Sequence, residues 1–188
     1  MIKKINEMLF HFIAKKHLAS HARERRFVNY TKAKSVFLLF ESDYLEKNKD
    51  VRQIINSLQQ DGKKVVAWGY VDKKHVSTSL MPDFSILNHE QVNIFNIPKH
   101  SFVRELEEQE FDLMIDLTPK EIIPLQYLSL YTKAHCKVGI RKNDLQMYDF
   151  LLDVDNVRSQ LDEADEPMNQ SYLYNQIIFY LKNIQTSD

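Results

Sequence analysis

The chain of 188 residues is 44% hydrophobic and 27% charged with a formal net charge of −1, a composition typical of one globular domain of average size. Its longest apolar runs have five residues, far short of the roughly 18 to 20 that cross a bilayer, so the sequence excludes a transmembrane protein. Its three glycines, Gly62, Gly69 and Gly139, are too far apart to form the phosphate-binding loop of a standard dinucleotide site or a P-loop.

Charge is distributed unevenly along the chain. Residues 1–34 hold nine Lys or Arg against two acids, whereas residues 144–188 hold nine acids against two cations. A basic arm of this kind could meet phosphate, an anionic membrane face or an acidic partner. It could equally lie on the acidic end of its own chain. We expect the second arrangement, because solvated charged faces are common and single surface ion pairs are weak.

The first predicted element is an amphipathic basic helix. Apolar residues recur at helical spacing with lysines between them, and the pattern extends to about Arg26. We divide the chain into an N-terminal basic helical extension, residues 1–34, and an α/β domain, residues 35–188. A secretory signal is the competing interpretation, but His11 interrupts the apolar stretch, so none is expected. The lone Cys136 cannot form an internal disulfide, which favours a cytoplasmic location.

Residues 35–70 predict a β-α-β unit. The segment 35–40 is continuously apolar and aromatic, which is typical of a strand buried on both faces of a sheet. Asp50 stands at an N-cap position, apolar residues follow at helical spacing, and Gly62 marks the helix end. Residues 64–70 predict the second strand, which such a crossover places parallel to the first.

Residues 92–134 continue the alternation. We expect a strand at 92–96, a short helix at 101–108 and a strong strand at 111–117. Thr118, Pro119 and Glu121 match the start of a capped helix, while Pro124 favours a start one turn later. In either case we expect the leucine-rich helix to extend to about Ala134.

The last third of the chain predicts two strands and a helix. Strands are expected at 136–140 and 148–154, and the seven residues between them are too few for a helical crossover. The last strand is therefore expected to be antiparallel or laterally displaced. The acidic stretch 162–166 predicts a loop that opens a final amphipathic helix. The fold class that follows is a three-layer α/β sandwich with a mainly parallel, Rossmann-like sheet, preceded by the basic amphipathic helix.

The block 111–118, the leucine-rich helix after it and the segment 136–141 resemble the N-terminal domain of heptosyltransferase-type glycosyltransferases, over roughly residues 35–155. The resemblance implies a Rossmann-like domain and an acid after the first strand that acts as base on an acceptor; Glu41 and Asp43 occupy that stretch. That family holds its nucleotide-sugar in a second domain, which we would expect to begin where the present sequence ends. The whole pattern also resembles a bacterial family of single-domain Rossmann-like proteins with no assigned activity.

Candidate site residues follow from the rule that ligands of such sheets bind at the carboxyl ends of the strands. Asp116 ends an apolar strand, and its partial desolvation would suit it to proton transfer. Asp43 is the second candidate base. The alternative for Asp116, which we favour, is that its oxygens accept hydrogen bonds from the turn that follows.

An anion site is the second hypothesis for this edge. Thr118 begins the predicted helix, and Lys120, Arg141 and Lys142 would supply positive charge beside its amides. A capping box with solvated cations is the alternative and the more common arrangement.

Other chemistry is not expected. His17 and His21 have metal-ligand spacing on a helix, but no third ligand lies at a matching interval, so no metal and no cofactor are predicted. Cys136 lacks an adjacent base and should be an inert buried thiol. The aromatic residues are not interleaved with the cations, so no nucleic acid partner is expected.

The sequence leaves two main functions and one less favoured function open. The first is a non-catalytic cytoplasmic binding or interaction protein, acting on an unidentified protein partner or as a homo-oligomer. The second is a glycosyltransferase-like enzyme, or half of one, with Asp116 or Asp43 as base and Arg141 on a phosphate group. A third and less favoured hypothesis is peripheral contact of residues 1–26 with an anionic membrane, which requires exposed apolar side chains on the first helix.

Overall fold

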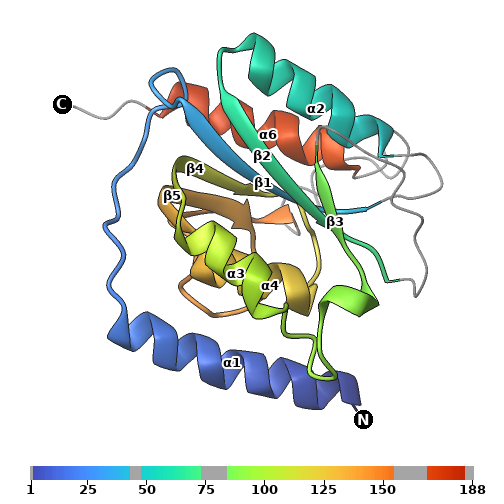
Figure 1. Cartoon of the computed structure of the whole chain (residues 1–188). Coiled ribbons are helices and arrows are strands. Elements are labelled where there is room, and N and C mark those ends of the chain that lie inside the picture. The colour runs from blue at the N-terminus through green and yellow to red at the C-terminus, as the bar shows by residue number, and fades with distance from the viewer. Residues whose placement is uncertain (1, 43–47, 73–83, 155–168, 185–188) are drawn as a thin grey trace.

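A computed structural model describes residues 2–42, 48–72, 84–154 and 169–184. Helices and strands alternate along the chain (Figure 1). The helices are α1 (Ile2–Ser20), α2 (Lys49–Gln60), α3 (His100–Glu107), α4 (Ile123–Tyr131) and α6 (Gln170–Asn183), with a 3-10 turn at His89–Gln91. The strands are β1 (Ser35–Glu41), β2 (Lys64–Tyr70), β3 (Ser85–Leu87), β4 (Glu110–Asp116), β5 (Lys133–Ile140) and β6 (Phe150–Leu152).

The described strands form one six-stranded sheet in the order β3-β2-β1-β4-β5-β6, and every neighbouring pair is parallel. The predicted α/β fold class is confirmed. The order reverses between β1 and β4, so the carboxyl ends of these two strands flank the switch point of a Rossmann-like sheet.

The prediction for the last strand was wrong, because β6 runs parallel to β5. Its three residues pair with the carboxyl-terminal part of β5, Val138 with Phe150 and Ile140 with Leu152. The chain therefore has to return only about three residues, roughly 10 Å, before it re-enters the sheet. A short loop covers that distance, and no helical crossover is needed.

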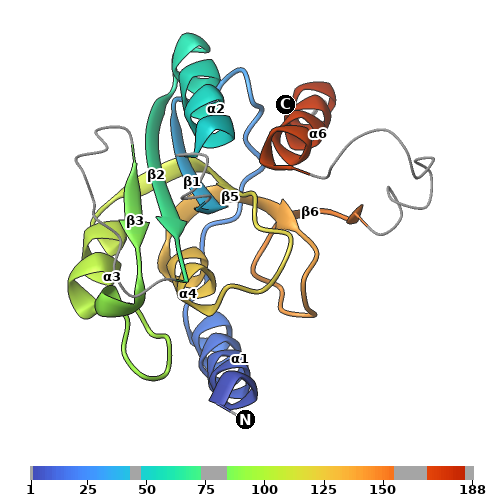
Figure 2. The same ribbon diagram turned by 90° about the vertical axis from the view of Figure 1, so that its right-hand side faces the viewer.

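Helices cover both faces of the sheet. One face packs against α2 and α6, and the other against α3 and α4 (Figures 1 and 2). Strand β1 is buried on both sides: Phe40 faces the α2 and α6 side, and Phe37 and Leu39 face the α3 and α4 side. This two-sided burial explains why the segment is apolar throughout.

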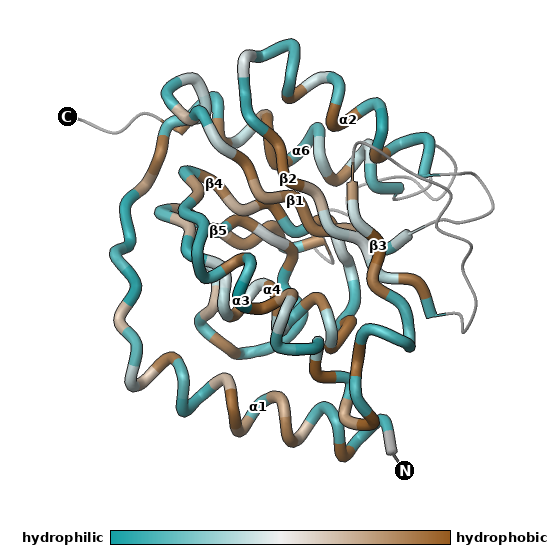
Figure 3. The backbone as a smooth tube through the Cα atoms, in the orientation of Figure 1, coloured by the Kyte–Doolittle hydropathy of each residue, from teal (hydrophilic) through white to brown (hydrophobic). Residues whose placement is uncertain are grey.

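Helix α1 forms a further layer outside α4. Phe10 and Ala14 on α1 are fully buried against Tyr127 and Leu130 of α4, and the rings of Phe10 and Tyr127 meet edge to face at 5.0 Å. Every residue of α4 from Ile123 to Leu130 is buried, because the sheet lies on one side of this helix and α1 on the other. Along α1 itself, hydrophobic and hydrophilic residues alternate (Figure 3).

Three predicted boundaries differ from the structure in the first half of the chain. Helix α1 ends at Ser20, and the extended residues after it lie along the part of β5 that β6 leaves unpaired, with the Arg26 amide donating to the His135 carbonyl. The N-cap of α2 is Asn48 rather than the predicted Asp50, and the helix begins at Lys49. Segment 92–96 is a turn with an isolated bridge at Val92, and β3 provides the edge strand instead.

The helix predicted after β4 begins at Ile123, in agreement with the alternative based on Pro124. Thr118 does not cap it, because its amide and hydroxyl are turned back to Asp116. The predicted acidic loop at 162–166 lies outside the described residues. Within the described ranges, no helix combines the length and apolarity that a membrane span requires.

Candidate functional site

The carboxyl edge of the sheet holds a closed polar cluster around Asp116, which is fully buried at the end of β4. Its Oδ1 accepts hydrogen bonds from the amide and the hydroxyl of Thr118, at 2.9 and 2.6 Å. Its Oδ2 accepts from Lys142 Nζ and from the Tyr148 hydroxyl, each at 2.5 Å. Both carboxylate oxygens are therefore fully engaged by the protein itself.

Tyr148 completes this cluster from the loop that precedes β6. Its ring lies against the backbone of β5 at Gly139, where a Cβ atom would stand 2.7 Å from the ring, so only glycine leaves room for it. Burial and the neighbouring Asp116 carboxylate raise the pKa of Tyr148 well above its usual value. The phenol is therefore a neutral donor at physiological pH.

The structure brings together only part of the set predicted for this edge. Thr118 and Lys142 both contact Asp116, and the side chain of Lys142 is only 2% exposed. Lys120 pairs instead with Glu41 at 2.7 Å. Arg141 lies 3.7 Å from Asp153.

Asp43, the second candidate base, lies outside the described residues. Within the described part of the chain, each cation predicted for the anion site thus has an acidic partner.

The opposite, amino edge of the sheet contains a pocket of about 830 Å³. The end of α1, the linker after it (residues 21–34), the end of α4 and the start of β5 surround it. Its lining carries four cations, Arg23, Arg25, Lys133 and Lys137, and three histidines, His17, His21 and His135. Three acids, Glu24, Glu107 and Glu110, also reach it. Cationic and imidazole groups therefore outnumber the acids around the pocket.

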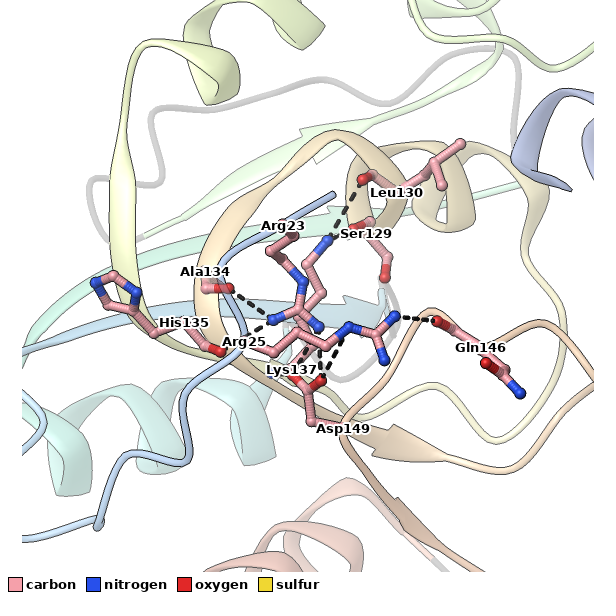
Figure 4. A network of polar contacts seen from close by, with 9 residues as sticks. All are labelled: Arg23, Arg25, Ser129, Leu130, Ala134, His135, Lys137, Gln146 and Asp149. Atoms are coloured by element: carbon pink, nitrogen blue, oxygen red, sulfur yellow. Dashed lines mark hydrogen bonds and ion pairs between the residues drawn. The ribbon is translucent and has the colours of Figure 1, made fainter. Parts of the chain in front are cut away.

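Lys137 is the most unusual residue of the pocket, because it projects from the middle of β5 and is only 3% exposed. Its Nζ donates to the carbonyls of Ser129 and Leu130 at the end of α4, at 2.5 and 3.4 Å (Figure 4). Burial lowers the pKa of Lys137 to about 7, and the charge of Arg23 acts in the same direction. This amine therefore changes its protonation near neutral pH.

Arg23 fastens the linker to the sheet beside Lys137. One guanidinium nitrogen donates to the carbonyls of Ala134 and His135, both at 2.9 Å. The other donates to both oxygens of Asp149, at 2.8 and 2.7 Å (Figure 4). Asp149 also accepts from the Lys137 amide at 2.8 Å. The predicted contact between the basic arm and the acidic end of the chain thus exists at Asp149.

Two histidines at the end of α1, His17 and His21, line the pocket together. The rings of His17 and His21 stack at 4.5 Å, and the ring of His17 also meets Tyr131 edge to face at 5.0 Å. Burial, together with the charge of His21, lowers the pKa of His17 below its usual value. Across the described ranges, no group of three or more potential metal ligands was found.

Sequence reasoning did not single out Lys137, Arg23 or Tyr148. Lys137 carries a signal in the sequence, because it is the one cation of the otherwise apolar segment 136–140, and a buried cation needs a polar partner. Tyr148 and Arg23 carry no such signal, since their partners are 32 and 126 residues away in the chain.

Comparison with known proteins identifies the family. The model of DUF6913, a family of unknown function, matches residues 7–184, and the chain therefore belongs to this family. Neither a curated protein nor a solved structure matches the chain.

Proposed function

We propose that this member of the DUF6913 family is a non-catalytic binding protein of the cytoplasm, and that the amino-edge pocket takes a small anionic ligand, a phosphate or a carboxylate. The observation that carries the proposal is the lining of the pocket. Four cations and three histidines gather around a volume that can enclose a small metabolite. Groups with shifted pKa values that converge on one pocket are typical of binding sites.

The cations of the pocket differ in how firmly the protein holds them. Arg23 is paired with Asp149 and Lys137 is held by carbonyls, so the protein already engages both of these cations. Lys133, the first residue of β5, is exposed and makes no ion pair with a described residue. We infer that Lys133 meets the ligand directly, with His135 beside it.

The enclosed state of Asp116 supports a non-catalytic function. A general base must reach the proton that it removes, directly or through one water. Asp116 has no exposed surface, and four donors already occupy its two oxygens. The buried free thiol of Cys136, whose pKa burial raises to about 11, suits a reducing compartment and adds no nucleophile.

Thermal-shift titration tests this proposal. We expect inorganic phosphate or a phosphorylated metabolite to raise the melting temperature of the wild type, because a ligand that binds only the folded state stabilises it. Lys133→Gln should reduce this shift strongly. The matched control is Lys64→Gln, since Lys64 is likewise an exposed first residue of a parallel strand but lies away from the pocket.

The outcomes of this titration show whether the ligand binds at the amino edge of the sheet or elsewhere. A ligand shift that Lys133→Gln removes and Lys64→Gln leaves intact supports the proposal. A shift that survives Lys133→Gln moves the site elsewhere, and the absence of a shift with any phosphate or carboxylate contradicts the anionic ligand.

A glycosyltransferase-like activity is the second candidate, supported by one observation. Asp116 ends β4 at the switch point of the sheet, where ligands of Rossmann-like sheets bind, and Arg141 follows β5 at the same edge. This candidate predicts a thermal shift with nucleotide-sugars that Arg141→Gln removes and Lys133→Gln does not. The same titration therefore decides between the two functions.

A further inference from the structure

We propose that the outward face of α1 docks on an anionic lipid surface. This inference does not rest on the pocket or on its ligand, because it uses side chains on the opposite side of α1 from α4. It concerns the helix that forms the outermost layer of the molecule (Figures 1 and 2).

Helix α1 has two apolar faces, and only one of them is covered. Phe10 and Ala14 are fully buried against α4. Ile5, Met8 and Phe12 recur at i, i+3 and i+7 on the other face, with 49, 73 and 69% of their surfaces exposed. A helix that packs on its own domain with one face usually carries polar residues on the opposite face.

Lysines flank the exposed apolar stripe. Lys4 and Lys15 lie on one side of it and Lys16 on the other, at roughly 100° of rotation per residue. They and Lys3 are exposed, and none of the four pairs with an acid in the described part of the chain. Glu7 is the one acid of the helix. An apolar stripe edged with lysines is the pattern of helices that lie in the membrane interface.

A second apolar element lies at the same end of the molecule. The turn after Val92 presents Ile94 and Phe95, which are 79 and 40% exposed. Asn93 holds this turn in shape, because its side-chain oxygen accepts from the amides of Phe95 and Ile97. Ile97 packs into the same cluster as α1 and α4, and Figures 1 and 2 both place the turn near the start of α1.

Lipid is a better occupant of this face than a second copy of the chain. Self-association through the stripe would bring the lysines of one copy against those of the other, and like charges at an interface are repulsive. An anionic lipid surface instead attracts each of these lysines, and the apolar side chains can enter the boundary between headgroups and acyl chains. The positive charge on the outward face of α1 therefore favours an anionic lipid surface over a second copy of the chain.

Flotation with lipid vesicles tests the proposal on the full chain. We expect binding to phosphatidylcholine vesicles that contain about 30% phosphatidylglycerol, weak binding to pure phosphatidylcholine, and loss of binding at high salt. Phe12→Trp supplies a reporter, since the one native tryptophan, Trp68, is buried. Its emission should shift to shorter wavelength when anionic vesicles are added.

Matched variants test whether vesicle binding depends on the exposed apolar stripe of α1 or on nonspecific hydrophobic adsorption. Phe12→Gln together with Met8→Gln should weaken vesicle binding at least tenfold, whereas Phe179→Gln, which removes an aromatic ring 60% exposed on α6, should leave it unchanged. Lys4→Gln and Lys15→Gln should each weaken binding about fivefold. Lys64→Gln should not.

Three results would overturn the inference. They are equal binding to neutral and anionic vesicles, no binding to either, and a dimer in solution that Phe12→Gln dissociates. The last result would assign the stripe to a second copy of the chain. Lys133→Gln should leave vesicle binding intact, so failure of the anion-binding proposal and failure of this one are distinguishable.

Discussion

Two buried lysines, Lys142 at the carboxyl edge of the sheet and Lys137 at the amino edge, are held in different ways. At the carboxyl edge, Lys142 contacts the Asp116 carboxylate, so a positive charge and a negative charge are buried together. At the amino edge, the Lys137 ammonium donates to the carbonyls of Ser129 and Leu130 and pairs with no carboxylate of the described residues. Carbonyl dipoles offset the desolvation of an ammonium less well than a full charge does.

This difference indicates which edge of the sheet can bind a ligand or change its protonation. The cluster around Asp116 is saturated with internal hydrogen bonds and acts as a structural tie between β4 and the loop before β6. The group around Lys137 borders a pocket, and burial lowers the pKa of its amine to about 7. Function is therefore better sought at the amino edge, although the fold class points to the other.

The largest expected effect comes from breaking the buried ion pair. Asp116→Leu leaves the Lys142 ammonium buried without a partner, and we expect the free energy of unfolding to fall by about 3 to 5 kcal/mol. Urea denaturation followed by circular dichroism measures this loss. The double variant Asp116→Leu with Lys142→Met should recover most of it, because no charge is then buried. If the single variant costs less than about 1 kcal/mol, the tie is not structural.

The pH dependence of stability tests the other lysine. The folded-state pKa of Lys137 lies below its unfolded value, so between about pH 7 and 10.5 the unfolded chain binds more protons than the native protein does, and the Lys137 contribution to stability rises with pH. From pH 7 to pH 9 this gain should reach about 2 kcal/mol. The measurement is urea denaturation at both pH values. Lys137→Met should remove the Lys137 contribution and so reduce the rise, and an unchanged rise in this variant would contradict the lowered pKa.

The smallest expected loss of stability comes from Arg23, which lies beside Lys137 at the amino edge. Arg23→Gln removes hydrogen bonds to Asp149 and to two carbonyls, and should cost about 1 to 2 kcal/mol. Because the charge of Arg23 lowers the pKa of Lys137, the variant should also begin its rise in stability at higher pH. Hydrogen exchange should show faster opening of residues 21–26. Arg141→Gln, whose pair at the carboxyl edge is exposed, serves as the control and should change neither property.

Much of the fold could be predicted from local pattern. The continuous apolar segments that became β1, β2 and β4 identify buried parallel strands, and the spacing of apolar residues identifies α2 and α6. The errors lie at the sheet edges. β3 and β6 have three residues each, too few to show a period, so the pattern could not locate the first or orient the second.

The candidate site could be predicted only in part, because its partners are distant in sequence. The hydrogen bonds from the turn to Asp116 were the favoured alternative, and the structure contains them at Thr118. The tie from Lys142 was not expected, since a solvated cation and a buried one look alike in a sequence. The pocket is also invisible there, as it forms only where the linker after α1 crosses β5.

The amino-acid sequence determined which segments must be buried, because hydrophobic periodicity is a local property that each strand or helix carries by itself. Tertiary structure decided which polar groups meet inside that framework. The sequence does not show which partner Lys137 or Lys142 will meet. Packing buries both of them, but it places a carboxylate, that of Asp116, in contact with the Lys142 ammonium alone. Charge interactions depend on distance and on local dielectric, and both are set by the fold.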